Sequence, residues 1–414
     1  MNRLVPSLIL VAALPLCAQT VKDREGAVRG DREKMSGNSR WIYNDVEAGF
    51  AEARRTGKPL MVVLRCVPCM ACMGIDEEVL TENRELKSLM DQFVRLRIIN
   101  ANSLDLSRFQ FDYDLSFSTL FFNGDGTVYG RYGSWEHQHD SQNRATETFR
   151  RALEGALGLH RRFPSNRDSL RGKQGGPFPY KRPVEMPILS GKYDLHLNWK
   201  GNVVKSCVHC HQIGDSIRLD HRNRKEAIPS KWIYPYPALE VLGVETDSKD
   251  FLKVSGITPG TPASRSDLKP GDRIESLDSQ PLISTADIAW ALHEAAERGR
   301  LAVTWTRGTQ SLSGNISLKA GWRSATDISD RVGTWPMRAM ALYVKHLGRY
   351  GKHGAAMRAG FLKHDVLIGL DGKSDRTTES RLIGEVLLNH QGGRRITAIV
   401  LRGKRRLDLK LPIQ

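Results

Sequence analysis

The sequence predicts a multidomain protein in which an α/β domain is followed by a short irregular segment and two smaller α+β units. Three observations lead to this fold class. The chain has 414 residues, which is more than one hydrophobic core normally serves. Residues 41–163 alternate strand-like and helix-like patterns, as compact α/β units do. Further along, the stretch ITPGTPASRSDLKPGDRIESLDSQPL is echoed by AAMRAGFLKHDVLIGLDGK, which indicates an internal duplication.

The first residues have the pattern of a secretory signal. Arg3 precedes an apolar run that ends at Leu16, and small residues follow, so we expect residues 1–18 to be a signal peptide. The run is too short to cross a bilayer comfortably, and the bulky Leu16 argues against lipidation of Cys17. We therefore expect a periplasmic or secreted protein with no transmembrane span in the mature chain. Residues 19–40 are polar and lack apolar periodicity, which predicts a linker.

The charge balance is basic but does not indicate nucleic-acid binding. The chain has 62 Lys and Arg against 46 Asp and Glu, a net charge of +16. These positive charges are scattered along the chain and form no recognisable nucleic-acid module, so we interpret them as solvated surface. Export also argues against a nucleic-acid partner, and we expect none.

The elements of the predicted α/β domain follow from periodicity and turn residues. An amphipathic helix should end at Gly57, and short apolar runs predict buried strands. The Gly124-Asp125-Gly126 turn predicts a hairpin. The expected elements are a helix at 46–56, strands at 59–64 and 93–100, a helix from 73, the hairpin at 118–133 and a closing helix at 146–163. Asp76, Glu77 and Glu78 are expected on the solvated face of the second helix.

Three cysteines follow the first buried strand. Cys66, Cys69 and Cys72 form two overlapping Cys-x-x-Cys pairs. A cysteine between a strand and a helix start meets backbone N–H groups and the positive helix end, which favour the reactive thiolate. This spacing suits thiol–disulfide exchange, but a structural disulfide or a soft-metal site that uses all three sulfurs remains an alternative. In the metal alternative, Met70 and Met73 become candidate ligands.

The segment GKPLMVVLRCVPCMACMGIDEEVL resembles the thioredoxin-like family, and the resemblance extends over residues 41–160. It implies that Cys69 is the attacking thiol, that Cys72 is the resolving thiol and that Cys66 is an additional thiol. Ser118 stands where the family has a cis-proline that faces the dithiol.

A second cysteine motif lies in residues 164–236, which we expect to be a linker with a short haem-binding segment. The stretch CVHCH matches the c-type haem attachment pattern, in which Cys207 and Cys210 bond to the porphyrin and His211 is the proximal iron ligand. The alternative is a zinc site in which the same sulfurs act with His209, His211 or His221.

The duplicated units, residues 237–320 and 336–414, look like PDZ domains of the kind attached to exported bacterial proteases. Such a domain binds an extended peptide along a sheet edge. The stretch LEVLGVE places Leu242, Gly243 and Val244 where N–H groups would meet a terminal carboxylate, and a helix from Thr285 would add Ile288 and Ala289 to the groove. The second unit has no glycine at the equivalent place.

The order of these parts resembles a group of exported thioredoxin/PDZ proteins, some of which carry selenocysteine. The resemblance implies a thiol–disulfide oxidoreductase or electron-transfer protein with haem c. Its PDZ domains would recruit periplasmic proteins or peptides, and it would need a redox partner. The alternative is a non-catalytic scaffold whose cysteine clusters bind zinc or copper.

Overall fold

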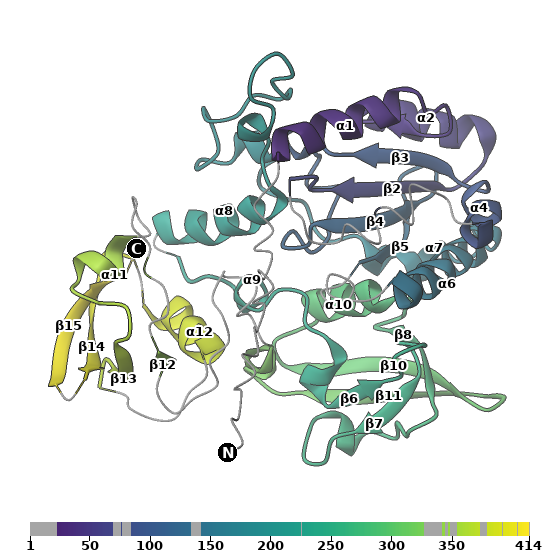
Figure 1. Ribbon diagram of the computed structural model, residues 1–414. Helices are drawn as coiled ribbons and strands as arrows, with labels where there is room; N and C mark the ends of the chain where they lie inside the picture. Colours follow the sequence, from purple (N-terminus) through teal and green to yellow (C-terminus); the bar gives the residue numbers. More distant parts are fainter. Residues whose placement is uncertain are drawn as a thin grey trace, which may run out of the picture.

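The computed structural model describes residues 23–68, 76, 84–133, 142–224, 226–326, 342–343, 347, 354–372, 379–390, 392–403 and 405–413. Figure 1 shows a first α/β domain in purple to teal, a second domain beneath it in green, and a smaller C-terminal unit in yellow to one side. None of the helices in these ranges has the length and apolarity needed to cross a membrane.

The first domain is built on a five-stranded sheet. Its strands are β1 (Ile42–Tyr43), β2 (Leu60–Arg65), β3 (Val94–Ile98), β4 (Phe117–Phe122) and β5 (Val128–Tyr132). The spatial order is β1-β3-β2-β4-β5, with β2 parallel to β3 and antiparallel to β4. Every residue of β2 is buried, as its continuous apolar run predicts, because the sheet is covered on both faces.

Helices cover both faces of this sheet, with α1 and α2 above the strands and α6 below them in Figure 1. They are α1 (Arg24–Ser36), α2 (Val46–Thr56), α4 (Arg84–Met90) and α6 (Gln142–Arg161). Alternate residues of β2 serve the two faces: Val63 packs in one cluster with Phe149 of α6, and Val62 packs in the other with Phe50 of α2. The predicted end of α2 is confirmed, since Gly57 caps it with φ 68°.

Residues 19–40 were expected to form a linker, but they contain α1. Its Val28 and Met35 are 4% and 2% exposed, and Met35 joins the same core cluster as Val63. Val28 and Met35 are seven residues apart and so lie on one helix face. Two buried residues in a polar segment are too weak a pattern for periodicity to detect.

Residues 164–236 also pack against the first domain and are not a free linker. They contain α7 (Arg167–Leu170), α8 (Cys210–Asn223) and α9 (Ser230–Ile233). Met186, Ile213 and Ile217 are buried in the cluster that contains Val62 of β2. The core of the first domain therefore continues well beyond residue 163, where the sequence predicted its end.

The second domain has two sheets and one principal helix. Its elements are β6 (Val244–Thr246), β7 (Val254–Ile257), β8 (Arg273–Leu277), β9 (Gln280–Pro281), α10 (Thr285–Glu294), β10 (Gly299–Arg307) and β11 (Gln310–Leu318). The larger sheet has the order β11-β10-β8-β9, and β6 pairs with β7. The predicted helix is confirmed as α10; the hydroxyl of Ser284 caps it by accepting hydrogen bonds from the N–H groups of Ala286 and Asp287.

The C-terminal unit repeats part of this structure. Its described elements are β12 (Leu342–Tyr343), α11 (Ala355–Arg358), β13 (Val366–Leu370), α12 (Glu379–Asn389), β14 (Arg395–Arg402) and β15 (Arg405–Pro412). Arg307 of the second domain binds Asp272 through two hydrogen bonds of 2.7 and 2.8 Å, and Arg402 binds Asp365 through two bonds of 2.8 Å. The same ion pair at corresponding places supports the predicted duplication.

Candidate functional site

Cys66 lies at the carboxyl end of the central strand. It directly follows β2, its N–H donates to the carbonyl of Ser116 at 2.9 Å, and it is 7% exposed. The predicted exchange pair, Cys69 and Cys72, lies outside the described residues. Ser118, at the cis-proline position, pairs with Leu64 in the ladder between β2 and β4, two residues before Cys66.

The imidazole of His209 lies against Cys66. The distance from Cys66 Sγ to His209 Nδ1 is 3.2 Å, although the two residues are 143 positions apart. The ring of His211 stacks on that of His209 with a centroid separation of 5.6 Å. A thiol beside an imidazole has a local acceptor for its proton, as in an activated sulfur nucleophile, and the same pair suits a soft metal. The two cysteine motifs of the sequence therefore meet at one place.

A buried ion network lies next to Cys66. Arg97 binds Asp76 at 2.6 Å and Asp31 at 2.5 Å, and Arg65 binds Asp76 at 3.1 Å and donates to the carbonyl of Cys66 at 2.6 Å. The prediction that Asp76 lies on a solvated helix face is wrong, because its side chain is only 14% exposed and is held by two guanidinium groups. Burial raises the pKa of Asp76, but Arg97 and Arg65 outweigh burial and keep that pKa below its ordinary value.

The haem motif is packed in a way that does not fit a covalent porphyrin. Cys207 is 9% exposed in a cluster with Ile99, and Cys210 is 8% exposed in the separate cluster with Ile213, whereas His211 is exposed. The Sγ of Cys207 lies 3.7 Å from the carbonyl oxygen of Ile99. Attachment requires both sulfurs to face one porphyrin edge, and here they face two different clusters. Covalent haem would therefore require this segment to repack around the porphyrin.

The zinc and copper alternative requires several ligands that face one metal ion. Within the described ranges, no group of three or more His, Cys, Asp or Glu side chains is arranged to hold a metal ion. A metal bound by Cys66 and His209 would therefore need further ligands from residues outside these ranges.

The predicted peptide-binding residues are divided between core and cavity. Leu242 and Val244 are fully buried in the core of the second domain, whereas Ile288 lines a cavity described below. The N–H of Gly243 donates to the carbonyl of Glu240 at 2.9 Å, so it is used inside the protein and is not directed at a carboxylate. Glycine is needed there for another reason: φ is 84°, and an added Cβ would lie 2.0 Å from the hydroxyl oxygen of Thr261.

Helix α10 of the second domain packs against β5, the edge strand of the first. The carboxylate of Asp287 binds Lys173 at 2.8 Å with both side chains 1% exposed, and it accepts the N–H of Arg131 at 3.0 Å. The hydroxyl of Ser284 donates to the carbonyl of Arg131 at 2.5 Å. The second domain therefore satisfies backbone groups that an edge strand would leave unpaired.

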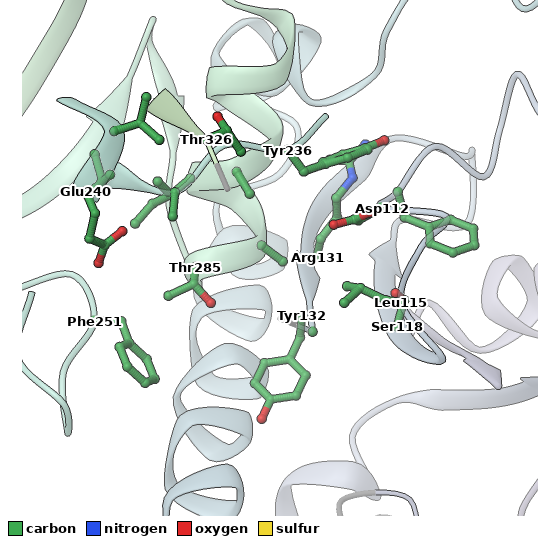
Figure 2. A pocket seen from close by; sticks show the side chains of 18 of the residues that line it. Asp112, Leu115, Ser118, Arg131, Tyr132, Tyr236, Glu240, Phe251, Thr285 and Thr326 are labelled. Carbon is green, nitrogen blue, oxygen red and sulfur yellow. The ribbon is translucent and has the colours of Figure 1, made fainter. Parts of the chain in front are cut away.

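A cavity of about 450 Å³ lies between these two domains. Figure 2 shows Ser118 and Arg131 of the first domain on one side, Glu240 and Phe251 of the second on the other, and Thr285 between them. The turn of α10 that follows Thr285 adds Ile288 and Ala289 to the lining, so one wall of the cavity is the helix predicted to line the peptide groove.

The sequence analysis missed two residues, His209 beside Cys66 and Arg131 at the interdomain cavity. His209 was weighed only as a metal ligand, although its place between Cys207 and Cys210 was the available signal. Arg131 had no signal, because one arginine in a strand pattern is normally a solvated residue.

The comparisons with known proteins agree with this architecture. Residues 41–124 match a family model described as thioredoxin-like, and residues 241–318 match a model described as a PDZ domain. A search of the curated proteins found no match. The second domain's strands and α10 lie within or next to the matched residues, and β1 to β4 lie within the first match. The chain therefore contains a thioredoxin-like domain followed by a PDZ domain.

Proposed function

We propose that this protein is an exported thiol–disulfide oxidoreductase whose PDZ domain holds the protein on which the thioredoxin-like domain acts. The observation that carries the proposal is the contact between Cys66 and His209, which places an imidazole beside a thiol at the end of the central strand of a thioredoxin-like sheet. The signal-like N-terminus supports export, and export favours disulfide chemistry.

The chemistry follows the usual course of dithiol exchange. The thiolate of Cys69 attacks one sulfur of a disulfide in the partner; a mixed disulfide forms, and the partner's other sulfur leaves and takes up a proton. Cys72 then attacks Cys69 in the mixed disulfide, so that the protein is oxidised and the partner is reduced by two electrons. The contact with His209 at 3.2 Å holds the additional thiol, Cys66, in place at the end of β2.

The test is reduction of insulin by the full chain with dithiothreitol as the electron source. A fragment that ends at residue 160 is unsuitable, because Met186, Ile213 and Ile217 belong to the core of the domain. We expect Cys69→Ser to abolish turnover, whereas Ser88→Ala on the exposed surface of α4 should leave it unchanged. Wild-type turnover in the Cys69→Ser variant would overturn the assignment.

A second candidate function rests on the same contact. Cys66 and His209 are both ligands that copper(I) and zinc accept, so a metal-binding scaffold would also place them together. Titration with either metal alone separates the candidates. Stoichiometric binding that is lost in His209→Gln, in a protein that does not reduce insulin, would favour the scaffold.

A further inference from the structure

The PDZ domain and the C-terminal unit, which repeats part of its structure, have opposite charges. Residues 237–320 contain 9 Lys and Arg against 11 Asp and Glu, whereas residues 336–414 contain 16 Lys and Arg against 6 Asp and Glu. The positive charge is therefore concentrated in the C-terminal unit, which has +10 of the +16 of the whole chain. Because the PDZ domain builds a related sheet with a net charge of −2, this kind of fold does not require the positive charge.

The ion pair that the two units share shows which of their residues correspond. Arg307 and Arg402 correspond, because each binds the aspartate of that pair. Arg307 pairs with Gln310 in the ladder between β10 and β11, and Arg402 pairs with Arg405 in the ladder between β14 and β15. Gln310 therefore corresponds to Arg405, and each following residue of β11 corresponds to one of β15.

The sheet of the C-terminal unit has an apolar outer face. Val400 of β14 is buried in the core, so its neighbours Ile399 and Leu401 lie on the opposite face, where both are partly exposed. The corresponding residues of β10 are Thr304 and Thr306. The same face of the sheet is therefore polar in the PDZ domain and apolar in the C-terminal unit.

Charged residues of β15 lie beside these apolar side chains. The ladder with β14 places Arg406, Asp408 and Lys410 on the outer face, and all three are exposed. The corresponding residues of β11 are uncharged: Ser311, Ser313 and Asn315. The outer face thus has an excess of positive charge that its counterpart in the PDZ domain lacks.

An exposed leucine lies at one end of the same sheet. Leu362, which precedes β13, is 51% exposed, and the adjacent Lys363 is exposed as well. The N–H of Leu362 donates to the carboxylate of Asp365 at 2.8 Å, and the same carboxylate binds Arg402 at the end of β14. Leu362 and Lys363 therefore extend the apolar and basic surface toward the turn between β14 and β15.

This outer face points away from the rest of the protein. Leu382 and Val386 of α12 pack against the inner side of the sheet, whereas Ile383 and Leu387 of the same helix pack against Ile233. Helix α12 therefore lies between the sheet and the other domains. Figure 1 shows the same arrangement, with β13, β14 and β15 on the far side of the C-terminal unit.

We propose that the outer face of the β13-β14-β15 sheet binds an anionic lipid surface. Lysine and arginine attract anionic headgroups, and apolar side chains beside them enter the boundary between headgroups and acyl chains. A lipid surface also has many negative charges, which complements a unit with a net charge of +10. A protein partner is typically held by anchors buried in a pocket, whereas here the cations and apolar groups are spread over an open sheet face. The inference goes beyond the proposed function, because it concerns where the protein is held and not which reaction it performs.

The test is co-sedimentation of residues 19–414 with vesicles of equal parts phosphatidylglycerol and phosphatidylcholine. The first 18 residues are left out because their apolar run would enter a bilayer by itself, and all described residues are kept. Arg405→Gln/Arg406→Ser gives two exposed positions the residues of the PDZ domain. Each lost cation should weaken binding about fivefold, and the pair about thirtyfold. The control, Arg161→Gln/Arg162→Ser, removes the same charge from exposed positions at the end of α6 and should bind as wild type does.

A second variant tests the apolar part of the surface. Ile399→Thr/Leu401→Thr also introduces the residues of the PDZ domain, and it should weaken binding by about tenfold or more. Thermal unfolding of each variant should give a midpoint near that of wild type, because the changed side chains lie outside the core.

Three results would overturn the proposal. The first is that wild type binds vesicles of pure phosphatidylcholine as well as it binds the anionic ones. The second is that the α6 control loses as much binding as Arg405→Gln/Arg406→Ser, because binding then follows net charge and not this face. The third is that the protein ignores vesicles but binds polyglutamate, which would assign the face to an acidic protein. The assay involves no disulfide chemistry, so its result is independent of the proposed oxidoreductase activity.

Discussion

The buried ion pair between Lys173 and Asp287 should hold the two domains together, and Asp287→Ala tests this. The substitution leaves a lysine that is 1% exposed without its carboxylate, which costs about 3–5 kcal/mol. It also removes the acceptor for the N–H groups of Arg131 and Ile283, now at 3.0 and 3.1 Å. Each unsatisfied N–H adds about 1–3 kcal/mol, so the total loss should be at least about 5 kcal/mol.

The loss should depend on pH in a defined direction. Burial lowers the pKa of Lys173 even though Asp287 raises it, so without Asp287 the folded protein binds that proton still less firmly. The unfolded chain then carries more protons than the folded variant, and the stability of Asp287→Ala rises with pH up to the ordinary lysine pKa. The difference in free energy of unfolding between wild type and Asp287→Ala should therefore be smaller at pH 9 than at pH 7.

Urea unfolding followed by tryptophan fluorescence measures both effects. Asp267→Ala, an exposed aspartate in the same domain, is the control and should cost less than about 0.5 kcal/mol. The double variant Lys173→Met/Asp287→Leu should be more stable than Asp287→Ala, because two apolar side chains leave no buried charge. The reasoning is refuted if Asp287→Ala lies within about 1 kcal/mol of wild type, or if the double variant is no better.

Three further predictions follow from single sites. Asp76→Asn should have a lower free energy of unfolding than wild type at pH 7, measured by urea unfolding. The difference between the two proteins should narrow below about pH 4, because Asp76, whose pKa is lowered beside Arg97, stabilises the fold only while its carboxylate is ionised. A difference in the free energy of unfolding that stays constant down to pH 3 would contradict this. Gly243→Ala should lower the free energy of unfolding by about 1 kcal/mol or more, because the added Cβ would meet Thr261 and the backbone there has φ 84°. Gly176→Ala is the control: Gly176 has open space around it and no positive φ, so its substitution should lower the free energy of unfolding by less in the same assay. Haem staining of a denaturing gel, after co-expression with a cytochrome c maturation system, checks covalent haem attachment. We expect no stain, because Cys207 packs against the carbonyl of Ile99. A stain that is present in the wild type and lost in Cys207→Ser would show instead that this segment rearranges around haem.

Local patterns were sufficient for much of the fold. The all-apolar run of β2 predicted a strand buried on both faces, and Gly57 predicted the end of α2, because strand burial and helix capping depend on neighbouring residues. The repeated stretch predicted a duplication, and the paired Asp272–Arg307 and Asp365–Arg402 contacts support it. Thioredoxin-like and PDZ resemblances were also recognisable, and the family models confirm one domain of each kind.

Local patterns failed where distant segments complete one core. Residues 19–40 and 164–236 are polar or irregular on average, yet Val28, Met35 and Met186 are buried because the first domain needs them to cover its sheet. Asp76 was predicted to lie on a solvated helix face, because no residue near it in the sequence indicates that Arg97, on strand β3, binds it.

The sequence by itself determined that the chain contains a thioredoxin-like domain and a PDZ domain, and it predicted which residue types could carry redox chemistry, because both depend on runs of neighbouring residues and on spacing. Only the tertiary structure decided that His209 meets Cys66, and that α10 of the PDZ domain closes against β5 to form a cavity lined by both domains. These are contacts between residues more than a hundred positions apart. Their geometry depends on how whole elements pack together, which no short stretch of sequence encodes.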